Sequence, residues 1–305
     1  MISPDSKRYN KNMKILVTGI HGQVGFELLR SLEHLGTLVL ADRSALDLAA
    51  PHTIRAFIQH HKPNLIVHPA AYTAVDRAEQ EPELCQQINA ASVAVMADEA
   101  AKLGAAMILF STDYVFDGSG DQPHLENDPT GPLNVYGASK LAGEQALARY
   151  CPQHLILRTS WVYSLRGTNF LLTMLKLSQE REHLRIVNDQ IGAPTWSRFI
   201  AERTADLITR YIHLHEGKTT LSCGPGVIHL TPSGATSWAG FAAEIFRLAD
   251  RNVQIEEIPS ISYPMPAQRP YNSRLDISKL EHLLGASMPS WEETLNHCLK
   301  GESRD

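Results

Sequence analysis

Short apolar runs alternate with longer stretches of helical periodicity over the first half of the chain. The apolar runs have the length of buried strands and lie at Lys14–Thr18, Leu38–Ala41, Leu65–His68, Ala106–Phe110 and Leu155–Leu157. Helices are predicted between them at Gln23–Leu35, Cys85–Leu103 and Tyr136–Tyr150. Strands that alternate with helices predict a doubly wound parallel sheet of the Rossmann type, an α/β fold with both sheet faces covered.

The alternation of apolar runs and helical stretches becomes less regular after about Trp161. Proline and glycine cluster between shorter helical stretches such as Trp238–Leu248, and the clusters lie at Gly192–Pro194, Gly224–Gly226, Pro232–Gly234 and Tyr263–Pro270. This shift predicts a first domain over residues 13–160 and a smaller C-terminal lobe over residues 161–305, with some segments returning to the first domain. The polar residues 1–12 are predicted to be a disordered leader.

The composition is that of an ordinary soluble globular protein, with a net charge of −5 and 20% charged residues. A mildly acidic chain lacks the positive charge that would attract nucleic acid or an anionic membrane. No apolar run approaches the ~20 residues that cross a bilayer. The four cysteines form no C-x-x-C pair and no secretory signal is visible, which favours the reducing cytoplasm.

A glycine-rich turn follows the first strand and opens the first helix. It reads TGIHGQVG over Thr18–Gly25. Glycines let backbone N–H groups approach a pyrophosphate, whose charge then lies at a helix N-terminus. The spacing is G-x-x-G-x-x-G rather than G-x-G-x-x-G, so a tight turn without a ligand is the alternative. The strand before it and the helix after it favour a dinucleotide site in the domain 13–160.

Asp42 and Arg43 close the second strand. An acid about 20 residues after the glycine turn meets the adenosine ribose in such folds. Arg43 beside it suits a 2′-phosphate, so the pair leaves NADH and NADPH both open. A solvated loop pair without a ligand is the other interpretation.

Tyr136 and Lys140 lie four residues apart, on one face of a predicted helix. A phenol, with a pKa of ~10, needs a nearby cation to exchange protons near neutrality. Lys140 would supply that charge and could bond the nicotinamide ribose. Ser111, Thr112 and Asp113 end the fourth strand, at the sheet edge where ligands bind. A hydroxyl there would hold a carbonyl oxygen while Tyr136 protonates it.

Taken together, these segments resemble the dTDP-4-dehydrorhamnose reductase family of extended short-chain dehydrogenase/reductases. The resemblance runs in order from about Met13 to the C-terminal helix. Its most specific parts are STDYVFDG, DQIGAPT and an R-P-x-x-S-x-L tail, and the matching segments lie at Thr18–Gly25 followed by Glu27, Leu46–Leu48, Pro69–Thr73, Ser111–Gly118, Tyr136–Lys140, Arg158–Tyr163, Asp189–Thr195 and Arg269–Leu275.

The resemblance implies reduction of the C4 ketone of dTDP-4-dehydro-L-rhamnose to dTDP-L-rhamnose, a sugar donor for polysaccharide synthesis. It implies Thr112, Tyr136 and Lys140 as the catalytic residues. The residues expected to line NADPH or NADH are Gly19, Gly22, Gln23, Val24, Gly25, Asp42, Arg43, Asp47, Leu48, Ala70, Ala71 and Tyr72, with Tyr136 and Lys140. The sugar nucleotide is expected at Thr112, Asp113 and Trp161.

For two of the predicted substrate-binding residues, a second interpretation is open. An aromatic face suits an apolar sugar face, so Trp161 is predicted to form a wall of the sugar site, with a half-buried core tryptophan as the alternative. Arg269 is predicted to grip the diphosphate of the sugar nucleotide bidentately, with a surface ion pair as the alternative.

No histidine pair has metal-ligand spacing, so no catalytic metal is expected. In some relatives, glutamates bridge subunits through magnesium, and Glu27 lies at one such position. One glutamate does not establish a magnesium site. A homodimer is compatible with the sequence but is not specified by it.

Two other functional classes remain open. Another nucleotide-sugar enzyme, such as a 4-epimerase, other 4-ketoreductase or 4,6-dehydratase, would use the same scaffold; a dehydratase usually needs an acidic pair after its threonine, and here only Asp113 precedes Tyr114. A non-catalytic module, like the regulatory subunit of methionine adenosyltransferase, would also share the fold. The intact Thr112, Tyr136 and Lys140 set favours an enzyme.

Overall fold

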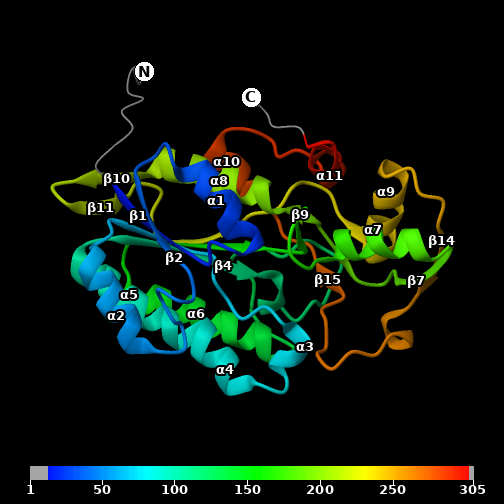
Figure 1. The fold of residues 1–305 in the computed structure, drawn as a ribbon, viewed down its shortest axis with the longest axis horizontal. Helices are drawn as coiled ribbons and strands as arrows, with labels where there is room; N and C mark the ends of the chain where they lie inside the picture. Colours follow the sequence, from blue (N-terminus) through cyan, green and yellow to red (C-terminus); the bar gives the residue numbers. More distant parts are fainter. Residues whose placement is uncertain (1–12, 302–305) are drawn as a thin grey trace.

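Six parallel strands form the central sheet of the computed structural model, which describes residues 13–301 (Figure 1). Their order is β12-β5-β4-β3-β1-β2, and their bounds are β1 Lys14–Thr18, β2 Thr37–Ala41, β3 Leu65–His68, β4 Ala106–Thr112, β5 His154–Thr159 and β12 Gly226–His229. The chain moves outward from β1 in both directions. The carboxyl ends of β1 and β3 therefore flank the switch point at which such sheets bind ligands.

Side chains of each inner strand alternate between two hydrophobic cores. Ile15 and Val17 of β1 pack into the core on one sheet face, and Leu16 between them packs into the core on the other. This two-sided burial is why the inner strands are apolar at consecutive positions. The predicted doubly wound α/β fold is confirmed.

Helices cover both faces of the sheet (Figure 1). One face is covered by α1 (Gln23–Leu32), α8 (Ser197–Tyr211) and α10 (Ser278–Leu284). The opposite face is covered by α2 (Pro51–His61), α5 (Ser92–Leu103) and α6 (Val135–Tyr150). None of the helices between residues 13 and 301 is long and apolar enough to cross a bilayer.

The helix expected at Cys85–Leu103 begins earlier and is interrupted. It comprises α4 (Pro82–Gln86), a π-helical turn η1 (Gln87–Ala91) and α5, preceded by the short α3 (Val75–Ala78). The wide turn brings the carbonyl oxygen of Asn89 against α6, where a Cβ on Gly143 would lie only 2.2 Å from it. π turns of this kind often occur at functional sites.

Most of the rest of the chain forms short strands and helices around the carboxyl edge of the sheet. The hairpin of residues 212–221 lies at the opposite edge, where the Thr219 hydroxyl donates to the carbonyl of Asn64 just before β3. The small sheets are β13-β8-β15 (Thr236–Ser237, Ile191–Gly192, Asn272–Ser273), β14-β7 (Gln254–Ile258, His183–Val187), β6-β9 (Val162–Tyr163, Thr195–Trp196) and β10-β11 (Ile212–His215, Lys218–Leu221). The remaining helices include α7 (Phe170–Glu180), α9 (Trp238–Leu248) and α11 (Trp291–Lys300). Although β12 and α8 come late in the sequence, they pack on the first half. The division at residue 160 stays a prediction, and the predicted leader lies outside the described residues.

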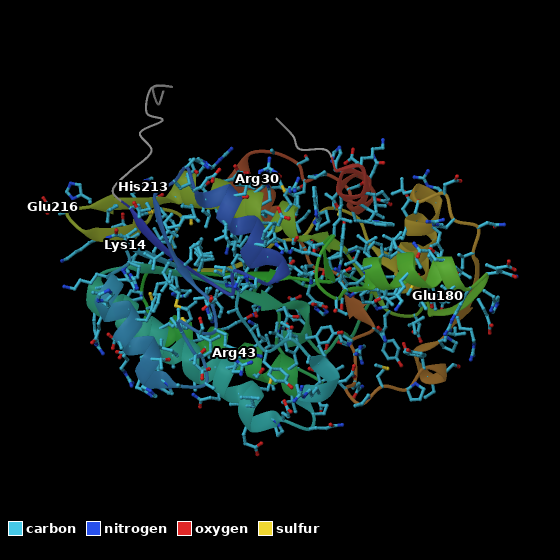
Figure 2. The ribbon with its side chains drawn as sticks, in the orientation of Figure 1. Lys14, Arg30, Arg43, Glu180, His213 and Glu216 are labelled. Carbon is cyan, nitrogen blue, oxygen red and sulfur yellow. The ribbon has the colours of Figure 1, made fainter. Side chains whose placement is uncertain are left out.

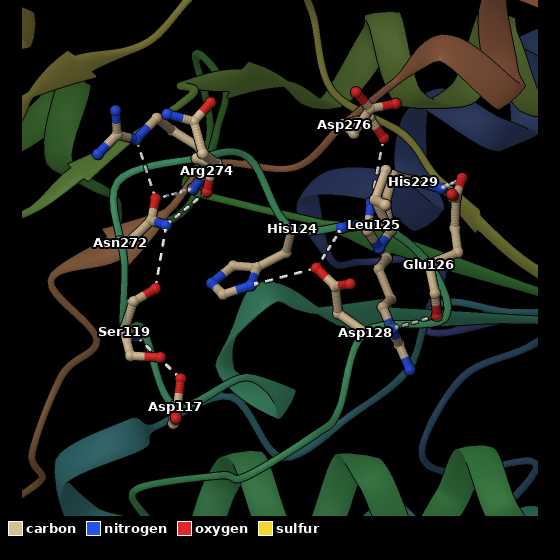
Figure 3. A network of polar contacts seen from close by, with 12 residues as sticks. Asp117, Ser119, His124, Leu125, Glu126, Asp128, His229, Asn272, Arg274 and Asp276 are labelled. Carbon is tan, nitrogen blue, oxygen red and sulfur yellow. Dashed lines mark hydrogen bonds and ion pairs between the residues drawn. The ribbon is translucent and has the colours of Figure 1, made fainter.

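A polar junction joins the C-terminal segment to the loop after β4 (Figure 3). The Asn272 amide donates to the carbonyls of Ser119 and Gln122, at 3.4 and 2.7 Å. The His124 N–H donates to the carbonyl of Arg274, and the Asp276 N–H donates to the carbonyl of His124. Behind it, Arg158 and Glu144 form a buried bidentate ion pair with N–O distances of 2.9 and 2.7 Å. This junction carries β15 to the carboxyl end of β4.

Candidate active site

A cavity of about 820 Å³ runs along the carboxyl edge of the sheet. Its volume is within the range of small-molecule and cofactor sites. The predicted cofactor-lining and catalytic residues all line it, together with Asp113 and Trp161. The fold therefore brings these residues into one continuous site, at the edge where the parallel strands end.

The glycine turn is built so closely that side chains would not fit. Gly19 has a φ of +58°, and a Cβ there would lie 2.9 Å from the backbone of Ala70. A Cβ on Gly25 would lie 2.1 Å from the carbonyl oxygen of Gly19. No side chain caps the N-terminus of α1, where Gly22 is the N-cap residue. The turn thus offers uncapped N–H groups to an anion, as the diphosphate of a dinucleotide requires.

Asp42 and Arg43 lie just beyond β2. The Asp42 carboxylate accepts hydrogen bonds from Ser44 N, Ser44 Oγ and Ala45 N at 2.9, 2.6 and 2.9 Å, and the Ser44 hydroxyl is the main cause that lowers its pKa. Arg43 is exposed at the rim of the cavity (Figure 2). An ionised acid beside an exposed guanidinium suits either a ribose hydroxyl or a 2′-phosphate.

The segment Ala70–Tyr72 is held from behind by Asn89. The Tyr72 N–H donates to the Asn89 amide oxygen at 2.8 Å, and the Asn89 amide nitrogen donates to the Tyr72 carbonyl at 3.0 Å. The same nitrogen donates to the Ser139 hydroxyl at 2.9 Å, which in turn donates to the carbonyl of Tyr136 at 2.7 Å. Asn89 therefore connects one wall of the cofactor cavity to the catalytic helix.

The catalytic tyrosine is placed by the start of α6. The Asn134 side chain caps this helix by accepting from Gly137 N at 2.8 Å. Gly137 lets the helix approach the carbonyl of Tyr114, since a Cβ there would lie 2.2 Å from that oxygen. Burial raises the pKa of Tyr136 above its usual value, and the neighbouring Thr112 hydroxyl only partly opposes this shift. At neutral pH the phenol therefore keeps its proton.

Lys140 is fully enclosed below Tyr136. Its ammonium donates to the carbonyl of Phe110 at 2.6 Å, and burial lowers its pKa to about 8. In this structure the ammonium bonds a strand carbonyl and desolvation is the main influence on the pKa of Tyr136, so the lowering of the phenol pKa by Lys140 stays a prediction. Lys140 nevertheless lines the same cavity as Tyr136.

Asp113 is a buried carboxyl beside the catalytic threonine. Its Oδ1 accepts from the Thr112 hydroxyl at 3.0 Å, while its Oδ2 has no hydrogen-bond partner among the described residues. Burial raises the pKa of Asp113 to about 6, and a hydrogen bond with Ser273 opposes the shift. Ser273 belongs to β15, next to Asn272 of the polar junction, so the C-terminal segment supplies a neighbour to this carboxyl.

Trp161 forms part of the cavity wall but does not stand alone. Its ring stacks on Trp238 with centroids 3.6 Å apart and planes 9° from parallel. Gly192 packs on Trp161 closely enough that a Cβ would lie 2.7 Å from the indole. The Trp238 indole N–H donates to Gln190 at 3.1 Å. The wall predicted from one tryptophan is a braced pair, and Trp161 itself has a left-handed φ of 46°.

Arg269 has a different partner from the one predicted. Its guanidinium forms a bidentate pair with Asp76, with N–O distances of 3.0 and 2.7 Å, and it also donates to the carbonyl of Ala267. It does not line the cavity. The structure therefore assigns it an ion pair between the C-terminal segment and α3, and direct contact with the sugar nucleotide stays a prediction.

Glu27 lies away from the cavity and accepts a hydrogen bond from Arg198 Nε at 3.0 Å. Within residues 13–301, no three His, Cys, Asp or Glu side chains are grouped so that they could hold a metal ion. The role of Glu27 visible in the structure is an ion pair between α1 and α8.

Sequence reasoning did not find several contributors to the cavity, among them the loop Arg166–Asn169, Trp238, Val75 and Ile88. The loop follows the matched segment Arg158–Tyr163, and its position after a strand at the same edge was the available signal. Trp238 lay in a predicted helix with no signal that its first residue faces a ligand.

Comparisons with known proteins agree with this geometry. A family model described as the RmlD substrate binding domain matches residues 13–303. The dTDP-4-dehydrorhamnose reductase of Escherichia coli K12 is 44% identical over 290 residues, covering 92% of this chain and 95% of that protein. A homologue of the same name from Burkholderia thailandensis is also 44% identical, covering 94% and 98%. The crystal structure of a Bacillus anthracis dTDP-4-dehydrorhamnose reductase in complex with NADP has a TM-score of 0.87 and 33% identity, covering 95% of this chain and 100% of that one.

Proposed function

This chain belongs to the RmlD substrate-binding-domain family of dTDP-4-dehydrorhamnose reductases, and on that premise we propose that it reduces the C4 ketone of dTDP-4-dehydro-L-rhamnose to dTDP-L-rhamnose with NADPH or NADH. One observation carries the proposal. The uncapped glycine turn and the Thr112, Tyr136 and Lys140 set line a single cavity. A dinucleotide seated on the turn and a ketone beside Tyr136 would therefore share that space.

The residues expected to hold the cofactor are those of the glycine turn, the end of β2 and Ala70–Tyr72. Gly19 and Gly25 allow the turn to pack closely on Ala70 and on itself, and the N-terminus of α1 stays without a side-chain cap, which suits an anionic diphosphate. When bound, the nicotinamide supplies the hydride that reduces the C4 carbon. Asp42 and Arg43 would meet the adenosine ribose, with Asp47 and Leu48 beside them.

The chain's own chemistry is to hold and deliver one proton. Tyr136 keeps its proton at neutral pH because its pKa is raised, and it donates that proton to the carbonyl oxygen as the C4 carbon becomes an alcohol. The Thr112 hydroxyl, which donates to Asp113 Oδ1 in this structure, would turn its proton toward the same oxygen and orient it. The Lys140 cation, present below its pKa of about 8, stabilises the phenolate that remains.

The sugar nucleotide is proposed to lie against Thr112, Asp113 and Trp161. Asp113 offers a buried carboxylate oxygen without a partner among residues 13–301, which a sugar hydroxyl could satisfy. Trp161 offers its indole at the wall that Trp238 braces. These contacts come from the ends of β4 and β5, opposite the glycine turn across the cavity.

Two further proposals concern the setting of the protein. All four cysteines are free thiols, three of them buried, which supports a reducing compartment, the cytoplasm. A homodimer is proposed as the assembly to test by light scattering.

A steady-state assay tests the activity. The chain should oxidise NADPH or NADH with dTDP-4-dehydro-L-rhamnose and act more slowly on the UDP counterpart. An epimerase would instead retain its nicotinamide through purification and interconvert sugars without net oxidation, and a non-catalytic module would leave both reactants unchanged. Either outcome would reject the reductase.

A further inference from the structure

Arg166 is a cation at the glycine turn, and no carboxylate among residues 13–301 pairs with it. It lines the cavity beside Gly22 and Gln23, and within residues 13–301 it forms no ion pair. Its guanidinium carbon lies 3.4 Å from the centroid of the Phe26 ring, and its Nη1 is buried without a hydrogen-bond partner. A guanidinium has five N–H donors, so most of this group's hydrogen-bonding capacity is unused by the protein.

The backbone of Arg166 is fixed to the turn. Its N–H donates to Ser164 Oγ at 3.2 Å, and its carbonyl accepts from Ser164 Oγ and Asn169 Nδ2 at 2.9 and 3.2 Å. Ser164 and Asn169 both also donate to the Gln23 amide oxygen at 2.8 Å. Because Gln23 is the first residue of α1, the loop that carries Arg166 is docked on the N-terminus of that helix.

The other basic side chains of the cavity have different positions. Lys140 bonds the Phe110 carbonyl, deep below Tyr136. Arg43 lies beyond β2, and His21, with a side chain 80% exposed, faces Asp42 at 3.8 Å. The first turn of α1 has no acidic residue that would compete for a cation. Arg166 therefore places a guanidinium near this helix N-terminus whose charge is not paired by any residue between 13 and 301.

We propose that Arg166 is a binding residue for the diphosphate of the nicotinamide cofactor. The proposal rests on the function proposed above. The α1 amides would bind one side of the diphosphate and the Arg166 guanidinium another, with charge-assisted hydrogen bonds. Phe26 stabilises the guanidinium by a cation–π contact, which fixes the plane of its donors before the ligand arrives. The sugar nucleotide also carries a diphosphate, but the contacts of Arg166 with Phe26 and its docking on Gln23 assign it to the cofactor.

Direct binding measurements test this without catalysis. The dissociation constants of NADH and NADPH would be measured by fluorescence titration for the wild type, for Arg166→Gln and for the control Arg181→Gln, an exposed arginine at the end of α7. Loss of a charge-assisted hydrogen bond predicts that Arg166→Gln weakens both cofactors by about tenfold or more. Arg181→Gln should leave both unchanged. An equal loss in both arginine variants would mean that only net charge matters and would overturn the proposal.

Two more measurements separate the sources of the diphosphate. Binding of dTDP should be the same in Arg166→Gln and the wild type, and a loss confined to dTDP would overturn the assignment. Phe26→Leu, at a half-exposed position, should weaken NADH and NADPH less than Arg166→Gln does, and a larger loss would contradict the order of roles. If the wild type bound neither cofactor, the proposed function would fail; if it bound both and Arg166→Gln bound them equally well, only the role of Arg166 would fail.

Discussion

The cofactor half and the substrate half of this cavity place their residues in different ways. Around the cofactor, Gly19, Asp42 and Ala70 each follow the end of a parallel strand, so adjacent strands deliver them to one edge. Around the substrate, Trp161, Gly192 and Trp238 come from separate segments and meet through ring stacking and close backbone packing.

The difference shows which constraints act at long range. In a parallel sheet all carboxyl ends lie at the same edge, so a ligand site there follows from topology. In the C-terminal lobe, the position of Trp238 depends on its hydrogen bond to Gln190 and on the pairing of β8 with β13 and β15. The cofactor half is therefore expected to tolerate changes around Trp238 and the β13-β8-β15 sheet, whereas the sugar site is expected to be sensitive to them.

The largest expected effect is that of Tyr136→Phe. The ring and helix remain but the proton donor is lost, so kcat should fall at least ~100-fold, the contribution of a positioned general acid. Titration with NADPH should give a dissociation constant close to that of the wild type. Turnover near the wild-type rate would remove Tyr136 from the chemistry.

The next effect is on the pH profile. Lys140 is charged below its pKa of about 8 and neutral above it, so kcat should decline as the pH rises through that value. Lys140→Arg keeps the charge at higher pH and should shift or abolish this decline, though at a lower rate. An alkaline limb that is the same in both proteins would assign the titration to another group.

A smaller effect is expected in the substrate half. Trp238→Leu removes a stacked pair of the kind that contributes about 0.5–1.5 kcal/mol, so KM for the sugar nucleotide should rise roughly two- to tenfold. KM for the cofactor should not change, since Trp238 braces Trp161 and not the glycine turn. Equal changes in both KM values would show that the two halves are not separable in this way.

The smallest effect is that of Arg43→Ala. Arg43 is exposed, and an exposed ion pair contributes about 0.2–1 kcal/mol, so affinity for NADPH should fall by no more than several-fold. Affinity for NADH should be unchanged, because the two cofactors differ only at the 2′ position. Equal losses for both would move the cofactor preference elsewhere in the loop after β2.

The same contrast explains what could be predicted from sequence. Strands such as Lys14–Thr18 and Leu65–His68 match the structure because two-sided burial gives a short apolar run. The sequence predicted an uninterrupted helix at Cys85–Leu103, whereas the structure has a π turn within it. The carbonyl of Asn89 in that turn packs against Gly143 on another helix. Periodicity does not report such contacts.

Prediction of the site is limited in the same way, because sequence patterns do not report contacts between distant segments. The residues predicted at strand ends line the cavity because topology places them there. The pairing of Arg269 with Asp76 and the docking of Arg166 on Gln23 join segments far apart in the chain. The pKa of Tyr136 is raised because desolvation outweighs its polar contacts. The local sequence pattern does not reveal this burial.

The proposed reaction requires one cavity to deliver a hydride and a proton to the C4 ketone of a dTDP-linked sugar. The most direct measurement incubates the wild type with dTDP-4-dehydro-L-rhamnose and with NADPH or NADH, each carrying deuterium in the transferred position. We expect dTDP-L-rhamnose with one deuterium on C4, detected by mass spectrometry and NMR, and one cofactor oxidised for each sugar formed. Unchanged ketone with both cofactors, or a product without deuterium on C4, would contradict it.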